Sequence, residues 1–186
     1  MKKFQTIIAL IFMVLMLSTG AGKSYAFVQA SASSAKLDPE IEIKPQDNRA
    51  EILESFLQSY GSPLAPYASD FVANADKYNL DWRLVASIAG LESTFGKHIP
   101  NYSYNAWGWG VYGTNVIRFV SWSEGIETIS KGLRENYLRD NPESNPFIIG
   151  PTYAASPTWA QRVTYFMNRI EEFQLRNGKS TLALAL

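Results

Sequence analysis

Two stripes of large apolar side chains at helical spacing constrain the fold of this chain more than any other feature. One runs from Trp122 to Tyr137 at intervals of 4, 3, 4 and 4 residues, and the other from Trp159 to Phe173 at intervals of 4, 3, 4 and 3. These intervals place every member on one face of an α-helix. Because such a face must be buried against another element, the sequence predicts a mainly α-helical domain.

Capping signals predict where further helices lie. Ser121-Trp122-Ser123-Glu124 matches the S-x-x-E capping box, and Ser156 precedes a proline at the first helical position. Other predicted helices begin at Asp47 or Asn48, cover residues 66–78, and run from Asp81 as the cap through residues 82–94.

Residues 100–120 contrast with these helical segments. They contain Gly108, Gly110 and Gly113, and apolar and polar residues alternate weakly from Asn115 to Val120. This pattern predicts a loop followed by a short strand or an irregular hairpin. The expected fold is therefore mainly α (α+β), with a helical bundle lobe, a small irregular or β-hairpin lobe and a cleft between them.

The N-terminus has the pattern of a secretory signal peptide. Two lysines precede an unbroken apolar run of 11 residues, Ile7–Leu17, and small residues follow as far as Ala26. The run is short for a membrane span, which requires about 20 residues. We expect residues 1–26 to be a signal peptide, either cleaved or retained as an anchor. A flexible linker is expected at 27–47, the domain at 48–176 and a frayed tail at 177–186 that opens with the helix-stop signal Asn177-Gly178.

Composition excludes several function classes. Loss of residues 1–26 leaves 14 basic and 17 acidic side chains, a net charge of −3, so a nucleic-acid or anionic-membrane partner is not expected. The chain has no cysteine and a single histidine, His98, which excludes thiolate chemistry and a histidine-based metal site. No cofactor is expected. The prediction is a secreted, monomeric protein with no integral span after cleavage.

Glu92 is the candidate catalytic residue. With Leu84 set to zero and about 100° per residue, Glu92 falls at about 80°, between Val85 and Ile88 on the apolar face. Burial favours the protonated form of a carboxyl, which a general acid requires, and the helix dipole acts in the same direction in a last turn. The alternative is a structural glutamate that pairs with an arginine or caps a loop.

The segment after Glu92 favours the catalytic interpretation. Ser93 can bond the following loop, Gly96 can end the helix as its C-cap, and a loop rich in aromatic residues and glycine begins soon afterwards. An acid followed by such a loop is consistent with a sugar-binding cleft, since aromatic rings stack on sugar rings.

Four motifs in this order resemble the lysozyme-like superfamily over about residues 66–174. They are Glu92-Ser93-x-x-Gly96, Asn105-Ala106-Trp107-Gly108, Phe119-x-Ser121-Trp122-x-Glu124-Gly125-Ile126 and Tyr153-Ala154. Two branches compete, the soluble lytic transglycosylases and the endo-β-N-acetylglucosaminidases of glycoside hydrolase family 73. The order of the motifs is more similar to the second branch, and the Gly-Leu-Met-Gln typical of transglycosylases is missing.

The resemblance implies Glu92 as catalytic acid and Tyr153 as a cleft residue opposite it. It also implies a substrate, the peptidoglycan strand of alternating N-acetylglucosamine and N-acetylmuramic acid. Candidate substrate-binding residues are Ser93, Asn105, Trp107, Trp109 and Tyr112. Each has a structural alternative, which is core packing for the aromatic residues, loop bonding for Asn105 and a helix-end hydroxyl for Ser93.

Glycoside cleavage usually uses two carboxyl groups, yet residues 97–123 contain no Asp or Glu. Glu124 is a candidate second acid, although the capping box also explains it. A single Glu92 can act as acid and then base if the acetamido oxygen or the muramic 6-hydroxyl of the substrate attacks C1. The sequence thus predicts a peptidoglycan glucosaminidase, with a lytic transglycosylase or a non-catalytic glycan-binding module on the same fold as alternatives.

Overall fold

Helices connected by loops make up most of the chain that the structure describes. The computed structural model describes residues 47–110 and 115–184, with side chains to Asn177, and all of them belong to one unit, residues 45–186. The predicted signal peptide, nearly all of the predicted linker and Tyr112 lie outside the described residues.

The helices follow the apolar stripes. In chain order they are α2 (Arg49–Ser59), the 3₁₀ turn η1 (Ala65–Tyr67), α3 (Ala68–Lys77), α4 (Leu84–Ser93), α5 (Trp122–Gly132), the π-helical turn η2 (Leu133–Leu138), α6 (Pro146–Tyr153) and α7 (Trp159–Leu184). The predicted stripe members Ile126, Ile129, Val163 and Ile170 are fully buried. This arrangement confirms the predicted mainly α-helical fold class.

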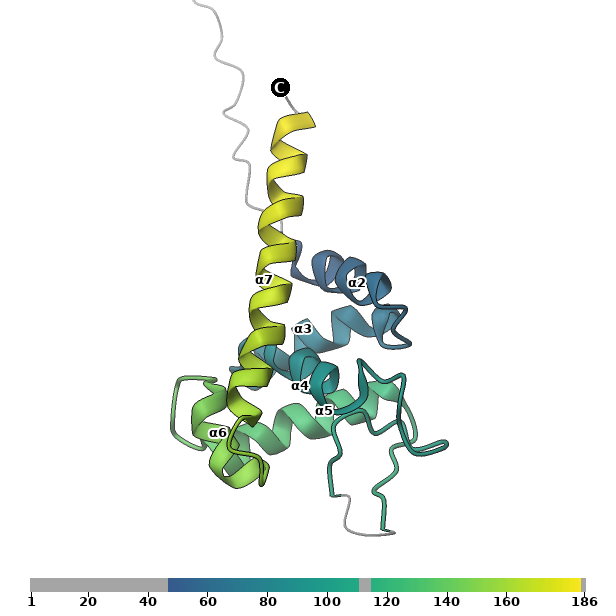
Figure 1. The fold of residues 1–186 in the computed structure, drawn as a ribbon, viewed down its shortest axis with the longest axis vertical. Coiled ribbons are helices and arrows are strands. Elements are labelled where there is room, and N and C mark those ends of the chain that lie inside the picture. Colours follow the sequence, from purple (N-terminus) through teal and green to yellow (C-terminus); the bar gives the residue numbers. More distant parts are fainter. Residues whose placement is uncertain (1–46, 111–114, 185–186) are drawn as a thin grey trace, which may run out of the picture. The chain divides into compact units, whose positions relative to one another are not determined.

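Helix α4 lies at the centre of the helical lobe. It packs against α3, α5 and α7, and its residues from Leu84 to Gly90 are all buried. Figure 1 shows α7, in yellow, running past both α4 and α2. Arg83 fixes the start of α4, because its guanidinium contacts Asp81 at 2.7 Å and Glu171 of α7 at 2.6 Å. These contacts set the position of α4 relative to α7.

Three helix boundaries correct the sequence prediction. Helix α6 was not predicted, because two prolines, Pro146 and Pro151, lie within its eight residues. The helix forms because Pro146 fills the first position, where proline is tolerated, and because the Asn145 side chain caps the helix by accepting from the Phe147 N–H. Helix α7 begins at Trp159 rather than Pro157. It also continues through the predicted stop at Asn177-Gly178, because one glycine costs a helix only about 1 kcal/mol.

The segment between α4 and α5 forms the small lobe. Its described part has no regular strand, and an N–H···O bond of 2.9 Å from Phe119 to the Ser103 carbonyl joins its two arms. Residues 115–120 therefore form an irregular segment, as one of the two predicted alternatives had it, and not a short strand.

Candidate active site

Helix α4 ends one residue after Glu92. Ser93 is its last residue, and Thr94 takes the C-cap in the left-handed conformation, with φ 54° and ψ 53°. Phe95 and Gly96 follow at φ 57° and 80°, and the Phe95 N–H donates to the Ala89 carbonyl at 2.9 Å. The prediction of Gly96 as C-cap was wrong, because the left-handed turn starts at a threonine. Two consecutive non-glycine residues at positive φ are typical of functional sites.

A buried phenylalanine holds this turn. Phe95 is fully buried, and its ring occupies the space above Gly90, where an added Cβ would lie 2.6 Å from the ring. It also packs edge-on against Phe56 and Phe166, with ring centroids 5.7 and 5.3 Å away. This packing offsets the backbone strain and ends α4 so that Glu92 lies in its last turn.

Ser93 fastens the end of α4 to the small lobe. Its Oγ lies 2.8 Å from the Ala106 carbonyl and 3.0 Å from the Ala89 carbonyl, and it accepts from the Gly96 N–H at 2.8 Å. The side chain is 4% exposed. Ser93 is therefore inaccessible to a sugar, and its place as a substrate-binding residue is corrected to that of a loop anchor.

Asn105 organises the small lobe from inside. Its Nδ2 donates to the carbonyls of Trp109 and Ile117 at 2.8 and 3.0 Å, and its Oδ1 accepts from the Trp109 N–H at 3.0 Å. Asn105 is 2% exposed, and both the oxygen and the nitrogen of its side-chain amide are already hydrogen-bonded. Asn105 therefore holds the loop and is not available to bind an N-acetyl group.

The two predicted tryptophan platforms have different environments. Trp107 is 1% exposed and donates its Nε1–H to the Val85 carbonyl at 2.9 Å, so both ring faces pack on protein and it cannot stack on a sugar. Trp109 is half-buried, and its ring lies 6.0 Å from that of Tyr137 and 6.2 Å from that of Tyr153. Of the two, only Trp109 has ring surface left for a ligand.

Glu92 itself is exposed, which corrects the expectation of a buried acid. The physical reason is that α4 stops at Ser93, so no further helical turn covers the carboxylate. Its Oε1 accepts a 2.8 Å hydrogen bond from the indole Nε1–H of Trp159, the first residue of α7. A Cβ placed on Gly108 would lie 3.9 Å from Oε2. The carboxylate thus lies between an indole and a glycine, and its hydrogen-bond donor among the described residues, the indole of Trp159, is neutral.

Tyr153, at the end of α6, lies beside Glu92. Its hydroxyl donates to the Trp107 carbonyl at 3.0 Å, and its ring stacks on that of Trp159 with centroids 4.7 Å apart. Burial raises the pKa of Tyr153 well above 10, and the negative charge of Glu92 and then Tyr137 add to the effect. The phenol is therefore neutral at physiological pH and can serve as a hydrogen-bond partner.

Glu124, the candidate second acid, is occupied by helix capping. Its Oε2 accepts from the Val120 N–H at 2.5 Å, and its own N–H donates to Ser121 Oγ at 3.1 Å. The predicted capping box is confirmed, although Glu124 reaches back to Val120 rather than to Ser121. The capping hydrogen bonds give Glu124 a structural role at the start of α5.

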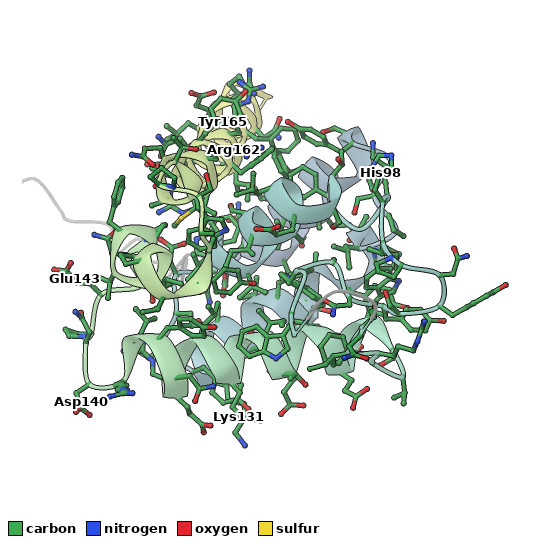
Figure 2. All side chains as sticks on the ribbon, turned by 60° about the horizontal axis from the view of Figure 1, so that its bottom comes forward. His98, Lys131, Asp140, Glu143, Arg162 and Tyr165 are labelled. Carbon is green, nitrogen blue, oxygen red and sulfur yellow. The ribbon has the colours of Figure 1, made fainter. Side chains whose placement is uncertain are left out.

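Other chemistry is not indicated by the part of the chain that the structure describes. No group of three or more potential ligands there is placed to hold a metal, and none of its helices is both long and apolar enough for a membrane span. His98 is exposed and lies at the periphery, as Figure 2 shows. A pocket of about 340 Å³ lies between α6 and the start of α7, and its wall is uncharged.

Trp159 is the site residue that sequence reasoning missed. Its place at the head of an apolar stripe predicted a core residue, and its ring is indeed 3% exposed. Its indole nitrogen nevertheless reaches Glu92, 67 residues earlier in the chain. The neighbouring Tyr153-Ala154 motif was the available signal that the start of this helix borders the site.

Comparison with solved structures supports the fold. The structure is similar to a catalytic mutant of S. aureus autolysin E in complex with the disaccharide NAG-NAM, with a TM-score of 0.53 and 16% sequence identity. The match covers 66% of this chain and 66% of that chain, so a third of the autolysin E chain has no counterpart in it. No protein-family model matches the sequence, and no curated protein does.

Proposed function

We propose that this protein is an exported glycosidase that cleaves the β-1,4 bonds of peptidoglycan strands, with Glu92 as general acid and then base. The observation that carries the proposal is the setting of Glu92, an exposed carboxyl at the end of a buried helix, held by one neutral donor and flanked by Tyr153. The similar fold of autolysin E, captured with NAG-NAM, supports a glycan strand as substrate.

The environment of Glu92 suits proton donation. The carboxyl lies in the last turn of α4 and is exposed, so a glycosidic oxygen can reach it. Among the described residues its hydrogen-bond donor is the neutral indole of Trp159, which keeps the group oriented. A positioned general acid contributes about 10²–10⁴-fold to the rate.

Because Glu124 caps α5, we assign the role of the second group to the substrate. In the proposed reaction Glu92 protonates the glycosidic oxygen while the acetamido oxygen of the sugar forms a bond to C1. The ionised Glu92 then removes a proton from the water that opens this ring, which yields a reducing end. The Tyr153 hydroxyl donates to the Trp107 carbonyl, so its oxygen is left to accept a hydrogen bond from the acetamido N–H, and Trp109 is half-buried and has ring surface for a sugar.

A lytic transglycosylase is the alternative that differs by product alone. In that route the muramic 6-hydroxyl attacks C1 and a 1,6-anhydro end forms without water. The missing Gly-Leu-Met-Gln motif favours the hydrolytic route.

Digestion of purified peptidoglycan tests the proposal. The native chain, Glu92→Gln and the control Glu127→Gln, an exposed glutamate paired with Lys77 at 2.7 Å, are incubated with peptidoglycan and the products read by mass spectrometry. We expect reducing N-acetylglucosamine ends from the native chain and the control, and none from Glu92→Gln. Anhydro ends would assign the transglycosylase route. Binding without cleavage by the native chain would instead show a non-catalytic module.

A further inference from the structure

The two oxygens of the Glu92 carboxyl have different neighbours. Oε1 accepts from the indole Nε1–H of Trp159 at 2.8 Å. Oε2 faces Gly108 and lies 3.9 Å from a Cβ placed on that exposed glycine, and no other described residue beyond its chain neighbours comes within 4 Å of this position. One oxygen is therefore occupied by the protein, and the other lies beside a residue that has no side chain.

The identity of the Oε1 partner decides where the acid proton resides. An indole nitrogen is a donor and has no acceptor function, so it pairs with the unprotonated oxygen of a neutral carboxyl. The proton of the neutral Glu92 must then be on Oε2, the oxygen beside Gly108.

The indole is itself fixed in place. The Trp159 residue is 3% exposed, and its ring packs on two residues of α6: the Tyr153 ring, with centroids 4.7 Å apart, and Gly150, where an added Cβ would be 3.3 Å from the indole. A ring confined in this way cannot follow the carboxyl if it rotates. The hydrogen bond consequently holds Glu92 in one orientation.

From this geometry we infer that Trp159 is a positioning residue, which holds Oε1 and leaves Oε2, beside Gly108, as the oxygen that gives and later takes the proton. The inference rests on the proposed function. As the C1–O bond breaks, its electron pair stays on the leaving oxygen, which takes the proton from Oε2. The charge that develops on the carboxylate strengthens the indole hydrogen bond, so the bond stabilises the transition state more than the ground state.

Substitution Trp159→Phe removes the donor and keeps an aromatic ring. We expect kcat to fall about 10- to 100-fold, the magnitude typical of losing one hydrogen bond made chiefly in the transition state, with KM changed less than about twofold. Trp82→Phe is the matched control, because it makes the same chemical change ten residues before Glu92, near the opposite end of α4. Its kcat should equal that of the native chain.

An NMR measurement on the native chain tests the same bond without a variant at Trp159. The chain has five tryptophans, and we expect the indole N–H resonance of Trp159, assigned through its contact with Tyr153, to move as Glu92 titrates. This movement should vanish in Glu92→Gln. Tyr153 keeps its proton throughout an acidic titration, because burial holds its pKa well above 10.

The outcomes separate this inference from the proposed function. A native chain that cleaves no peptidoglycan would overturn the proposed function. If the native chain cleaves, an unchanged kcat in a folded Trp159→Phe overturns the inference alone. If that variant does not fold, an indole resonance of Trp159 that ignores the titration of Glu92 overturns it, and one that follows it supports it.

Discussion

The C-terminal end of α4 and the N-terminal end of α5 each carry a glutamate, and the two ends hold it in opposite ways. At the N-terminal end of α5 the Glu124 carboxyl accepts a hydrogen bond from the Val120 N–H at 2.5 Å. At the C-terminal end of α4 the hydrogen-bond donor to Glu92 among the described residues is the neutral indole N–H of Trp159.

The two hydrogen-bonding environments distinguish a glutamate with a structural role from one with a catalytic role. The fold ties Glu124 to the backbone N–H of Val120, so removing its carboxyl would weaken the start of α5. The fold fixes the orientation of Glu92 and leaves one of its oxygens beside Gly108. An acid that must alternate between protonated and ionised forms needs the second arrangement.

The largest expected effect comes from removing each carboxylate in turn. We expect Glu92→Gln to lower the rate of peptidoglycan cleavage by about 10²–10⁴-fold and to leave stability within about 0.5 kcal/mol, because the side chain is exposed. Glu124→Ala should do the reverse, with cleavage retained and stability lower by about 0.5–1 kcal/mol through loss of the cap.

Initial cleavage rates and chemical denaturation measure the two quantities on the same preparations. Equal losses of activity in the two variants would end the distinction between the two helix ends, and so would a loss of stability confined to Glu92→Gln.

Features encoded by neighbours in sequence were predictable. The stripe of α5, the capping box at Ser121 and the position of Glu92 in a last turn all depend on residues within a few positions of one another. The pattern does not show which partner each face meets. It therefore placed Glu92 on an apolar face but could not show that the helix ends too soon to bury it.

Features that depend on distant contacts were missed. Trp107 resembled a sugar platform because it lies in a glycine-rich loop, yet its indole reaches Val85 and is buried. The left-handed Thr94 is retained because the buried Phe95 ring anchors the turn, and no local propensity favours threonine there. The contact between Trp159 and Glu92 joins residues 67 positions apart, which spacing alone cannot reveal.

The second prediction concerns how the turn after Glu92 is anchored. Gly90→Ala would place a Cβ 2.6 Å from the Phe95 ring, which is fully buried and has no room to move. We expect stability to fall by about 1–3 kcal/mol despite the better helix propensity of alanine, and cleavage to fall as well, because the turn positions Glu92.

Ser87→Ala is its matched control in the same helix. The buried Ser87 hydroxyl has no hydrogen-bond partner among the described residues, so its removal should raise stability by about 0.5–1 kcal/mol. Urea denaturation of both variants measures the change in the free energy of unfolding, which should decrease for Gly90→Ala and increase for Ser87→Ala. A Gly90→Ala variant as stable as the native chain would show that Phe95 does not anchor the turn.

The third prediction concerns the raised pKa of Tyr153, to which burial and the nearby Glu92 contribute. The folded-state pKa of Tyr153 is raised above its unfolded value near 10, so below pH 10 both states keep the proton. Above pH 10 the unfolded chain releases it and the folded chain does not, and stability must fall as pH rises. The loss is at most about 1.4 kcal/mol per pH unit for one group.

Denaturation between pH 9 and 11 checks this loss. Tyr153→Phe should remove that part of the slope, whereas the exposed Tyr165, labelled on α7 in Figure 2, provides the control substitution Tyr165→Phe. Parallel curves for the native chain and Tyr153→Phe would show that the phenol is not held neutral beside Glu92.

The smallest expected effect tests the strain at the end of α4. Thr94 has φ 54°, a conformation that glycine adopts without steric penalty. We expect Thr94→Gly to raise stability by a few tenths to about 1 kcal/mol, since relief of the strain outweighs the greater freedom of glycine in the unfolded chain. Thermal and urea denaturation measure the gain, and cleavage should not increase, because Phe95 still sets the turn.

The start of α5 provides the control. Its cap, Ser121, has an extended, unstrained backbone, so Ser121→Gly should lower stability by a few tenths of a kcal/mol. If both glycine substitutions destabilise, the Thr94 backbone is not a source of strain, and the two helix ends differ in charge alone.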